Sequence, residues 1–369
     1  MSKKGKSVIF SGGGTSGHIN PAIAIAQRLR LEVPETEIAF LGTANSLESK
    51  IVPRAGFAFY PIKAKGFPHR PGKDLWLAYR EYKTGVGQSL ALMDQLKPDV
   101  VVGTGGYVCG PVLSAAKKRG IPHLIHEQNA YPGRNNRFMA RGADVVCISY
   151  EQTRRFFKRA HKVVLTGNPV REVFYNLDRA TARRQLGMDE NEFIILATGG
   201  SLGARRINQA VVEFIKMNPD LPARVILACG ERMVDETMEL AQAVEPGKLH
   251  IEPYLYDMQL YMAAANLIIC RAGAITCAEV AALGRGSVLV PYPYAAADHQ
   301  TWNARVFSDV GAALLCADAD LSGDWLTRQL LPLFRQTDQI QAMEEKVSQF
   351  AMPESVTDIV NELRRLYQD

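Results

Sequence analysis

Short apolar runs alternate along the whole chain with longer segments of mixed polarity. The runs at 99–103 and 287–291 are continuously apolar, which is typical of parallel strands buried on both faces. Segments such as 46–56 and 112–120 repeat apolar residues at helical spacing. This alternation predicts an α/β protein with doubly wound parallel sheets that are covered by helices on both faces.

A strand, a glycine loop and a helix open the chain and recur at 193–215, where they begin a second half. A chain of 369 residues exceeds the size at which a single core stops growing, so two domains are expected. Ligands of doubly wound sheets bind beyond the carboxyl ends of the strands. We therefore expect two Rossmann-like domains facing across a cleft, with a ligand gripped from both sides.

Gly167 and Pro169 interrupt the pattern between the two halves. We expect an N-terminal domain over residues 1–168 and a C-terminal domain over residues 169–352. A last helix, at about 353–369, is expected to leave the second domain and pack on the first.

Composition narrows the class of protein further. The chain is 47% hydrophobic and 22% charged, as ordinary globular proteins are, and its net charge of +5 gives only a weak attraction to anions. No nucleic-acid partner is expected. Six cysteines form no C-x-x-C pair, which predicts buried, reduced thiols. The first apolar run is too short for a signal peptide, so we expect a protein that is not secreted.

Four strand ends carry glycines, at Gly12–Gly17, Gly103–Gly110, Gly199–Gly203 and 271–276. One such turn is more often a packing device, but four in one α/β chain favour binding of phosphate or sugar. The first loop lacks both the dinucleotide fingerprint and the P-loop lysine. A dehydrogenase is therefore disfavoured, and the loop is not a P-loop.

Two loops of the second half predict contacts to a nucleotide. The hydroxyl of Ser201 and the helix start that follows it can hold a diphosphate. Glu279 lies about one turn beyond Thr276, at the start of another helix, where a carboxylate can accept both hydroxyls of a ribose. An acidic residue that complements the helix dipole would look the same.

Polar residues cluster at 126–129 and at 298–305, where strands are expected to end. Burying such groups is unfavourable unless they point into a site or satisfy the backbone of their own loop. Both interpretations are open for 126–129. In the second cluster, Gln300 is available to a hydroxyl-rich ligand.

His18 follows the first glycine loop at the expected start of a helix, whose dipole disfavours an imidazolium. A neutral imidazole there can take a proton from a nucleophilic hydroxyl, although a structural histidine bonded to nearby backbone is the commoner case. No Ser–His–Asp order, glycosidase carboxylate pair, H-E-x-x-H or D-x-D motif is evident. We expect transfer without a covalent intermediate, a metal or a cofactor.

Together, these motifs resemble one known family. "GGGTSGHINPAIAIA", "HEQNAYPGRNN", "GGSLGARRIN", "RAGAITCAEVAALG" and "DHQTWNAR" follow one another as in the MurG family, the bacterial N-acetylglucosaminyltransferases of peptidoglycan synthesis. The resemblance covers nearly the whole chain and implies the GT-B fold. It implies inverting transfer of N-acetylglucosamine from UDP-N-acetylglucosamine to a muramoyl-pentapeptide linked by diphosphate to undecaprenol. It also implies a peripheral position on the anionic, cytoplasmic face of the cell membrane.

The resemblance also implies which residues act. His18 is the implied base toward the 4-hydroxyl of the acceptor. The implied donor contacts are Thr15, Ser16, Gly17, Asn129, Arg171, Ser201 and Gln300. The implied uracil and ribose pocket consists of Leu255, Ala274, Ile275, Thr276, Cys277, Ala278 and Glu279. Ser16 stands where the family usually has glycine, which should narrow the loop slightly without abolishing binding.

Residues 69–86 are the expected membrane contact. Read as a helix from Asp74, this segment places four bulky residues on one stripe with Trp76 beside it: Leu75, Tyr79, Tyr82 and Val86. Basic residues surround the stripe: His69, Arg70, Lys73, Arg80 and Lys83. An ordinary core face has the same spacing. Aromatic residues beside basic ones favour the boundary of an anionic bilayer.

Two other functions remain open on sequence alone. One is a related GT-B transferase that acts on a diacylglycerol or another lipid or natural-product acceptor. The motifs at 103–111 and 126–129 argue against it, because both belong to the acceptor-side half. The other is a non-catalytic subunit that binds a nucleotide sugar. The presence of both halves, each with its loops, argues against that function.

Overall fold

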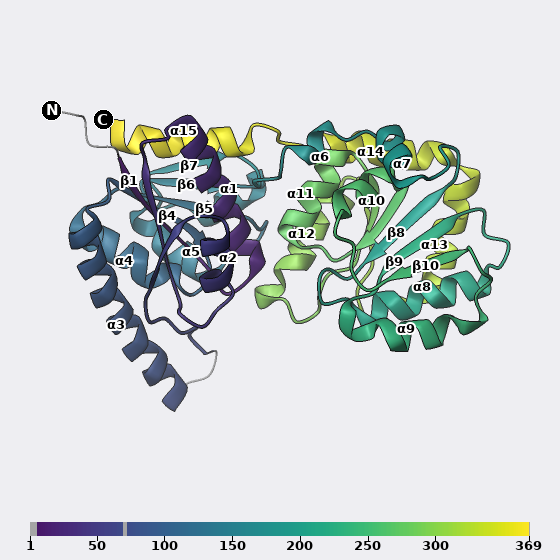
Figure 1. Cartoon of the computed structure of the whole chain (residues 1–369), viewed down its shortest axis with the longest axis horizontal. Helices are drawn as coiled ribbons and strands as arrows, with labels where there is room; N and C mark the ends of the chain where they lie inside the picture. The colour runs from purple at the N-terminus through teal and green to yellow at the C-terminus, as the bar shows by residue number, and fades with distance from the viewer. Residues whose placement is uncertain (1–5, 69–71, 369) are drawn as a thin grey trace. The chain divides into compact units, whose positions relative to one another are not determined.

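The computed structural model describes residues 6–68 and 72–368, which form two compact units (Figure 1). The first unit comprises the chain up to Val170 together with the residues from Glu354 onward, and the second comprises Arg171–Pro353. The division lies two residues beyond the boundary expected at 168–169. The last helix belongs to the first unit.

The first unit is built on a seven-stranded, all-parallel sheet of order β3-β2-β1-β4-β5-β6-β7. The strands are β1 (Ser7–Gly12), β2 (Glu37–Gly42), β3 (Ala58–Pro61), β4 (Val100–Gly105), β5 (His123–Glu127), β6 (Val145–Ile148) and β7 (Lys162–Leu165). Its α-helices are α1 (Ser16–Glu32), α2 (Glu48–Arg54), α3 (Lys73–Leu96), α4 (Cys109–Arg119), α5 (Arg134–Met139) and α15 (Ser355–Gln368).

Each face of this sheet has its own core, because successive side chains of a strand point to opposite faces. Val8 and Phe10 of β1 pack with α1, α2 and α15. Ile9, between them, packs with α3 and α4 and with Phe157. The continuous apolar runs of the sequence therefore fill two cores at once.

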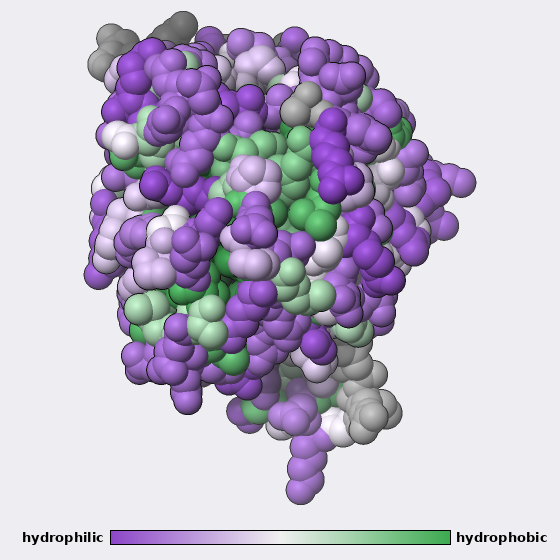
Figure 2. All heavy atoms as spheres, turned by 90° about the vertical axis from the view of Figure 1, so that its right-hand side faces the viewer, coloured by the Kyte–Doolittle hydropathy of each residue, from purple (hydrophilic) through white to green (hydrophobic). Residues whose placement is uncertain are grey.

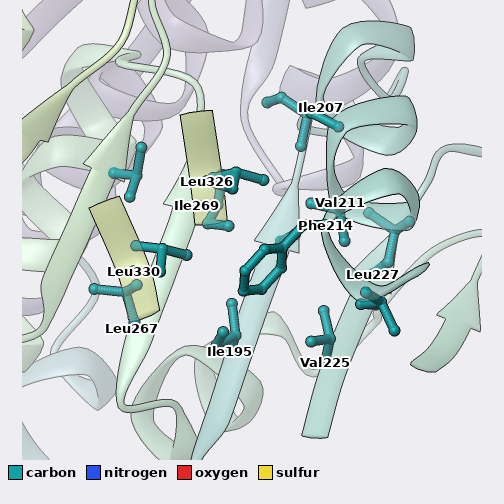
Figure 3. Packing of buried hydrophobic residues seen from close by; sticks show 14 of the residues in the cluster. Ile195, Ile207, Val211, Phe214, Val225, Leu227, Leu267, Ile269, Leu326 and Leu330 are labelled. Atoms are coloured by element: carbon teal, nitrogen blue, oxygen red, sulfur yellow. The ribbon is translucent and has the colours of Figure 1, made fainter. Parts of the chain in front are cut away.

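The second unit repeats the design with a six-stranded parallel sheet of order β10-β9-β8-β11-β12-β13. The strands are β8 (Ile194–Thr198), β9 (Arg224–Ala228), β10 (Leu249–Glu252), β11 (Leu267–Cys270), β12 (Gly286–Leu289) and β13 (Leu314–Leu315). The α-helices are α6 (Val173–Asn176), α7 (Arg179–Leu186), α8 (Arg205–Met217), α9 (Val234–Leu240), α10 (Met258–Ala264), α11 (Ala274–Leu283), α12 (His299–Ser308), α13 (Gly323–Arg335) and α14 (Thr337–Ser348). Phe214 of α8 lies among Ile195, Ile269 and Leu326 in the core (Figure 3).

Both sheets reverse their strand order at one point, between β1 and β4 in the first unit and between β8 and β11 in the second. The crevice beyond the carboxyl ends of the strands at such a point is where doubly wound sheets bind ligands. The glycine loops after β1, β4, β8 and β11 all lie at these two points. The carboxyl ends of the strands at these two points are therefore the places where each unit is expected to bind a ligand.

The loops at these strand ends meet backbone against backbone. A Cβ on Gly106 would lie 2.1 Å from the carbonyl oxygen of Gly13, and a Cβ on Gly203 would lie 2.0 Å from that of Cys229. Both glycines have positive φ angles, +84° and +74°. Any side chain at either position would force the two loops apart.

On the face shown in Figure 2, hydrophilic residues predominate and hydrophobic ones gather in a few patches among them. Such an arrangement is normal for a folded chain. Among residues 6–68 and 72–368, no helix is long and apolar enough to cross a membrane.

Candidate active site

Glu48, a buried residue that begins α2, holds the first glycine loop in place. Its carboxylate accepts hydrogen bonds from the Gly14 amide (3.2 Å), the Thr43 amide (3.2 Å) and the Thr43 hydroxyl (2.7 Å). Burial alone would raise the pKa of Glu48, but hydrogen bonds that include those from Ser46 and Thr43 outweigh it and lower the pKa. An ionised carboxylate therefore fixes the loop, and the sequence analysis did not identify it.

His18 is the third residue of α1, next to the first glycine loop. Its Nδ1 lies 3.1 Å from Oε1 of Gln128, and its carbonyl oxygen accepts a hydrogen bond from the Thr104 hydroxyl at 2.7 Å. A Cβ on Gly105 would lie 2.7 Å from that Nδ1. The ends of β4 and β5 thus set the position of the ring from two sides.

The partners of Gln128 determine which nitrogen of His18 carries the proton. Nε2 of Gln128 donates to the carbonyl oxygen of Thr104 (2.8 Å) and lies 2.9 Å from Nδ1 of His126, while Nε2 of His126 lies 2.9 Å from the carbonyl oxygen of Gly167. Because a carbonyl only accepts, His126 donates through Nε2 and accepts from Gln128 through Nδ1. Oε1 of Gln128 then faces His18, so Nδ1 of His18 donates.

This chain of hydrogen bonds has a chemical consequence. In a neutral imidazole whose Nδ1 holds the proton, Nε2 is the nitrogen that accepts one. Burial lowers the pKa of His126 to about 4, so His126 stays neutral near neutral pH. The arrangement therefore leaves Nε2 as the His18 nitrogen that can accept a proton.

The polar cluster at 126–129 makes hydrogen bonds to its own loop and to His18. The carboxylate of Glu127 accepts hydrogen bonds from the amides of Asn129 (3.0 Å) and Gly133 (3.1 Å) and from the Asn136 side chain (2.9 Å). Glu127 therefore satisfies its own loop. Its neighbours in the cluster, His126 and Gln128, form the hydrogen-bond chain that orients the His18 ring.

Glu279 lies in α11 of the second unit, beyond Gly273, which caps that helix. Burial raises the pKa of Glu279 to about 7, and the guanidinium of Arg171 opposes the rise. The side chain of Arg171 also donates to Gln259 of α10 at 3.3 Å. Within the described residues, the carboxylate of Glu279 makes no hydrogen bond, so both of its oxygens can accept from a ligand.

The other predicted donor residues lie on neighbouring loops of the second unit. Ser201 is exposed in the loop between β8 and α8, and Leu255 is buried between β10 and α10. Gln300, the second residue of α12, accepts through Oε1 from the Tyr292 amide at 2.9 Å. Cys277 lies in the core, so its side chain is not a ligand contact; only its backbone can be one.

The predicted site residues divide between the units: Thr15, Ser16, Gly17, His18 and Asn129 are in the first, and Arg171, Ser201, Leu255, 274–279 and Gln300 are in the second. In the first unit, residues 15–18 follow β1 and Asn129 follows β5. In the second unit, Ser201, Leu255, 274–279 and Gln300 follow β8, β10, β11 and β12, so they come after the carboxyl ends of four different strands, and Arg171 precedes α6.

The expected surface stripe of α3 is only partly exposed. Leu75, Trp76 and Tyr79 are 38%, 64% and 49% exposed. Val86 is buried instead, and the hydroxyl of Tyr82 hydrogen-bonds Ser114 of α4 at 2.6 Å. Tyr82 is half-buried, so it is less available to a membrane surface than the three exposed residues. His69 and Arg70 lie outside the described residues.

Basic side chains accompany the exposed part of this stripe. Arg80 lies over the Trp76 ring, 5.2 Å from its centre, and Lys83 lies 4.8 Å from the centre of the Tyr79 ring. Lys73 is exposed at the start of the helix. The name "α3 patch" is used below for Leu75, Trp76 and Tyr79.

Comparison with known proteins defines the class. Residues 8–148 match the glycosyltransferase family 28 N-terminal domain, and residues 194–361 match the glycosyltransferase family 28 C-terminal domain. The chain is therefore a glycosyltransferase, and the predicted GT-B fold is confirmed.

Individual relatives narrow the family. A protein of Acetivibrio thermocellus is 41% identical over 362 residues, which cover 98% of this chain and 96% of the relative. It is named UDP-N-acetylglucosamine–N-acetylmuramyl-(pentapeptide) pyrophosphoryl-undecaprenol N-acetylglucosamine transferase, as is a relative from Desulforudis audaxviator that is 40% identical over 97% of this chain and 98% of its own length. The crystal structure of Acinetobacter baumannii MurG superimposes with a TM-score of 0.82 at 33% identity, covering 98% and 99% of the two chains. The chain belongs to the MurG family.

The close approach of Gly105 to His18 gives a test of the site. Gly105→Ala should displace the imidazole, because the new Cβ would lie 2.7 Å from Nδ1 and the backbone φ of +110° is strained for alanine. Misplacing a catalytic group by about 1 Å costs on the order of 10²-fold in rate, so glycosyl transfer should fall by about that factor.

Gly120→Ala is the matched control, since its φ of +66° is also positive but its Cβ would meet nothing within 4 Å. The transfer rates of both variants are measured on a short-chain acceptor, and UDP binding shows whether each variant is folded. Equal rates in the two variants would show that the position of His18 does not matter.

Proposed function

We propose that the chain transfers N-acetylglucosamine from UDP-N-acetylglucosamine to the muramoyl-pentapeptide diphosphoryl-undecaprenol lipid, with inversion at the sugar. The observation that carries this proposal is the orientation of His18 by Gln128, which leaves Nε2 as the nitrogen able to accept a proton, beside the glycine loop that follows β1. The printed names of the relatives supply the donor and the acceptor.

In the proposed reaction, Nε2 of His18 removes the proton from the 4-hydroxyl of the acceptor as that oxygen attacks C1 of N-acetylglucosamine. The bond between C1 and the diphosphate oxygen breaks, and UDP leaves with the electron pair. In the imidazolium that forms, Nδ1–H still donates its hydrogen bond to Oε1 of Gln128. Attack opposite the leaving group inverts the anomeric carbon in one step.

The second unit supplies recognition of the donor in this proposal. The loop with Ser201 and the N-terminus of α8 hold the diphosphate, whose charge grows as it leaves. Glu279 accepts the ribose hydroxyls and Leu255 borders the uracil. Arg171, beside Glu279, and Gln300 complete the contacts to the diphosphate and the sugar.

The acceptor carries a lipid that stays in the bilayer, so the enzyme must work at a membrane surface. We assign the α3 patch to this contact, on the cytoplasmic face of the cell membrane. Trp and Tyr favour the membrane–water boundary, and each nearby cation adds about 1 kcal/mol on an anionic surface. Arg80 and Lys83, stacked on the patch, are such cations.

The base is tested with His18→Ala. The variant should lower kcat by roughly 10²–10⁴, which is the usual size of a general-base contribution, while UDP binding is retained. The acid limb of the rate profile, which protonation of the base produces, should disappear. A fall of less than about threefold, far below that range, would make His18 structural and place the base elsewhere.

Recognition of the donor is tested through pH. Because burial raises the pKa of Glu279 to about 7, this carboxyl is protonated below that pH and ionised above it. Only the ionised form accepts two hydroxyl hydrogen bonds, so UDP-N-acetylglucosamine should bind more tightly as pH rises through about 7. Both phosphates of this donor are esterified, so the ligand itself does not titrate there.

Glu279→Gln is the matched variant for this measurement. Loss of a charge-assisted hydrogen bond costs about 1.5–3 kcal/mol, so above neutral pH the variant should bind the donor roughly tenfold to a hundredfold more weakly. Its affinity, measured by calorimetry, should not change with pH around neutrality. The same pH profile in both proteins would remove Glu279 from the donor site.

The membrane contact is tested with Leu75→Ser and Trp76→Ser combined. Binding to anionic vesicles should fall roughly tenfold, because exposed apolar area is lost, and high salt should weaken what remains. The control combines Leu31→Ser and Leu47→Ser, which remove exposed leucines elsewhere on the first unit. Activity on a detergent-soluble, short-chain acceptor should survive in both. If the Leu75 and Trp76 variant unfolds or loses activity on every acceptor, these residues stabilise the fold and the membrane contact lies elsewhere.

A further inference from the structure

The first unit contains a cavity whose lining includes none of the proposed site residues. This cavity of about 610 Å³ lies between α5 and the segment that connects β6 to β7. Its wall on the α5 side is formed by Arg134, Arg137, Phe138, Ala140 and Arg141, and its other wall by 155–160. A cavity of this size is in the range that small-molecule sites occupy.

All of the charged side chains that line this cavity are positive. Six cationic side chains line it: Arg134, Arg137, Arg141, Arg155, Lys158 and Arg159. No carboxylate belongs to the lining. Elsewhere on the first unit, arginines pair with acids, as Arg119 does with Asp94 and Arg154 with Glu151. The cavity is therefore a local concentration of charge on a protein whose net charge is only +5.

Three of the guanidinium groups lie over aromatic rings. Arg137 is 5.0 Å from the centre of the Tyr131 ring, and Arg155 is 4.9 Å from that of Phe156. Arg141 lies 5.7 Å from the centre of the Phe138 ring. Stacking restrains the planes of these groups and leaves their N–H donors at the edges. Such planar, oriented donors match the oxygens of phosphate.

One donor in this cluster is buried and unsatisfied. Nε of Arg137 has no hydrogen-bond partner within residues 6–68 and 72–368. Over the same ranges, Arg137, Arg141, Lys158 and Arg159 form no ion pair. A buried donor left unsatisfied costs about 1–3 kcal/mol, and like charges held together repel one another. An anion in the cavity would remove both costs.

We infer that this cavity binds a phosphate-bearing anion, separately from the nucleotide site proposed in the second unit. Facing guanidinium groups on its two walls suit a ligand with more than one phosphate oxygen to offer. Phe138, which is 60% exposed, adds an apolar surface beside the charges. Both a soluble diphosphate and the head group of an anionic phospholipid present this chemistry.

The cavity is coupled through α5 to the edge of the sheet that holds His18. Asn135 donates to the carbonyl oxygen of Gly106 at 2.9 Å, and Asn136 donates to Glu127 at 2.9 Å. Arg134 and Arg137, their neighbours on the same helix, line the cavity. An anion bound there therefore steadies the helix that supports the second glycine loop.

The test compares two doubly substituted proteins. Arg141→Ser with Arg159→Ser removes one exposed cation from each wall of the cavity. Arg54→Ser with Lys118→Ser is the control, because it removes two exposed cations from the same unit outside the cavity. Both proteins should retain glycosyl transfer to a short-chain, detergent-soluble acceptor, which shows that they fold.

Two probes distinguish the sources of the phosphate. Pyrophosphate is titrated by calorimetry in the presence of saturating UDP, and vesicles of phosphatidylglycerol are compared with vesicles of phosphatidylcholine. Loss of at least tenfold in pyrophosphate affinity in the cavity variant alone supports a soluble ligand. The same selective loss on phosphatidylglycerol vesicles alone supports a lipid head group. If the cavity and control variants bind both probes equally well, the inference is wrong.

Discussion

The rest of the structure depends on one constraint: at the carboxyl ends of each sheet, two backbone segments approach each other so closely that one of them must be glycine. Where Gly106 meets Gly13, and where Gly203 meets the carbonyl of Cys229, no room remains for a Cβ. These contacts keep the strand ends of each sheet close together, and the amides of Gly13 and Gly14 donate within the unit, to the carbonyl oxygen of Gly105 and to Glu48. His18 then stands above Gly105, which also lacks a Cβ that would displace the ring.

Two buried carboxylates hold this arrangement, and both are satisfied by their own loops. Glu48 accepts from the first glycine loop and from Thr43, while Glu127 accepts from the loop that leads into α5. Charge-assisted hydrogen bonds to backbone amides offset the desolvation of these groups. Neither carboxylate needs to touch a substrate, yet each fixes a loop that the proposed chemistry uses.

Much of the fold follows from the sequence, because continuous apolar runs and helical spacing mark parallel strands and their covering helices. The edge strands β3, β10 and β13 were not anticipated, because they are short and only partly buried. The sequence predicts candidate site residues where a glycine loop and a helix start fall together, and the structure does place His18 and Glu279 in the helices that follow such loops. The roles of Glu48 and Gln128 were not predictable, because each depends on a partner distant in sequence: Glu48 acts on Gly14 and Gln128 on His18.

The placement of α15 has a consequence for how the protein is made. Ile359, Val360 and Leu363 are fully buried against the core that contains Phe10, although almost the whole chain separates them in sequence. During synthesis, all of the second unit leaves the ribosome before these three side chains do. The apolar face of α1 must therefore wait uncovered while the second unit folds. The unit that begins first is the last to be completed, and that interval is when a nascent chain is most exposed to aggregation or to capture by a chaperone.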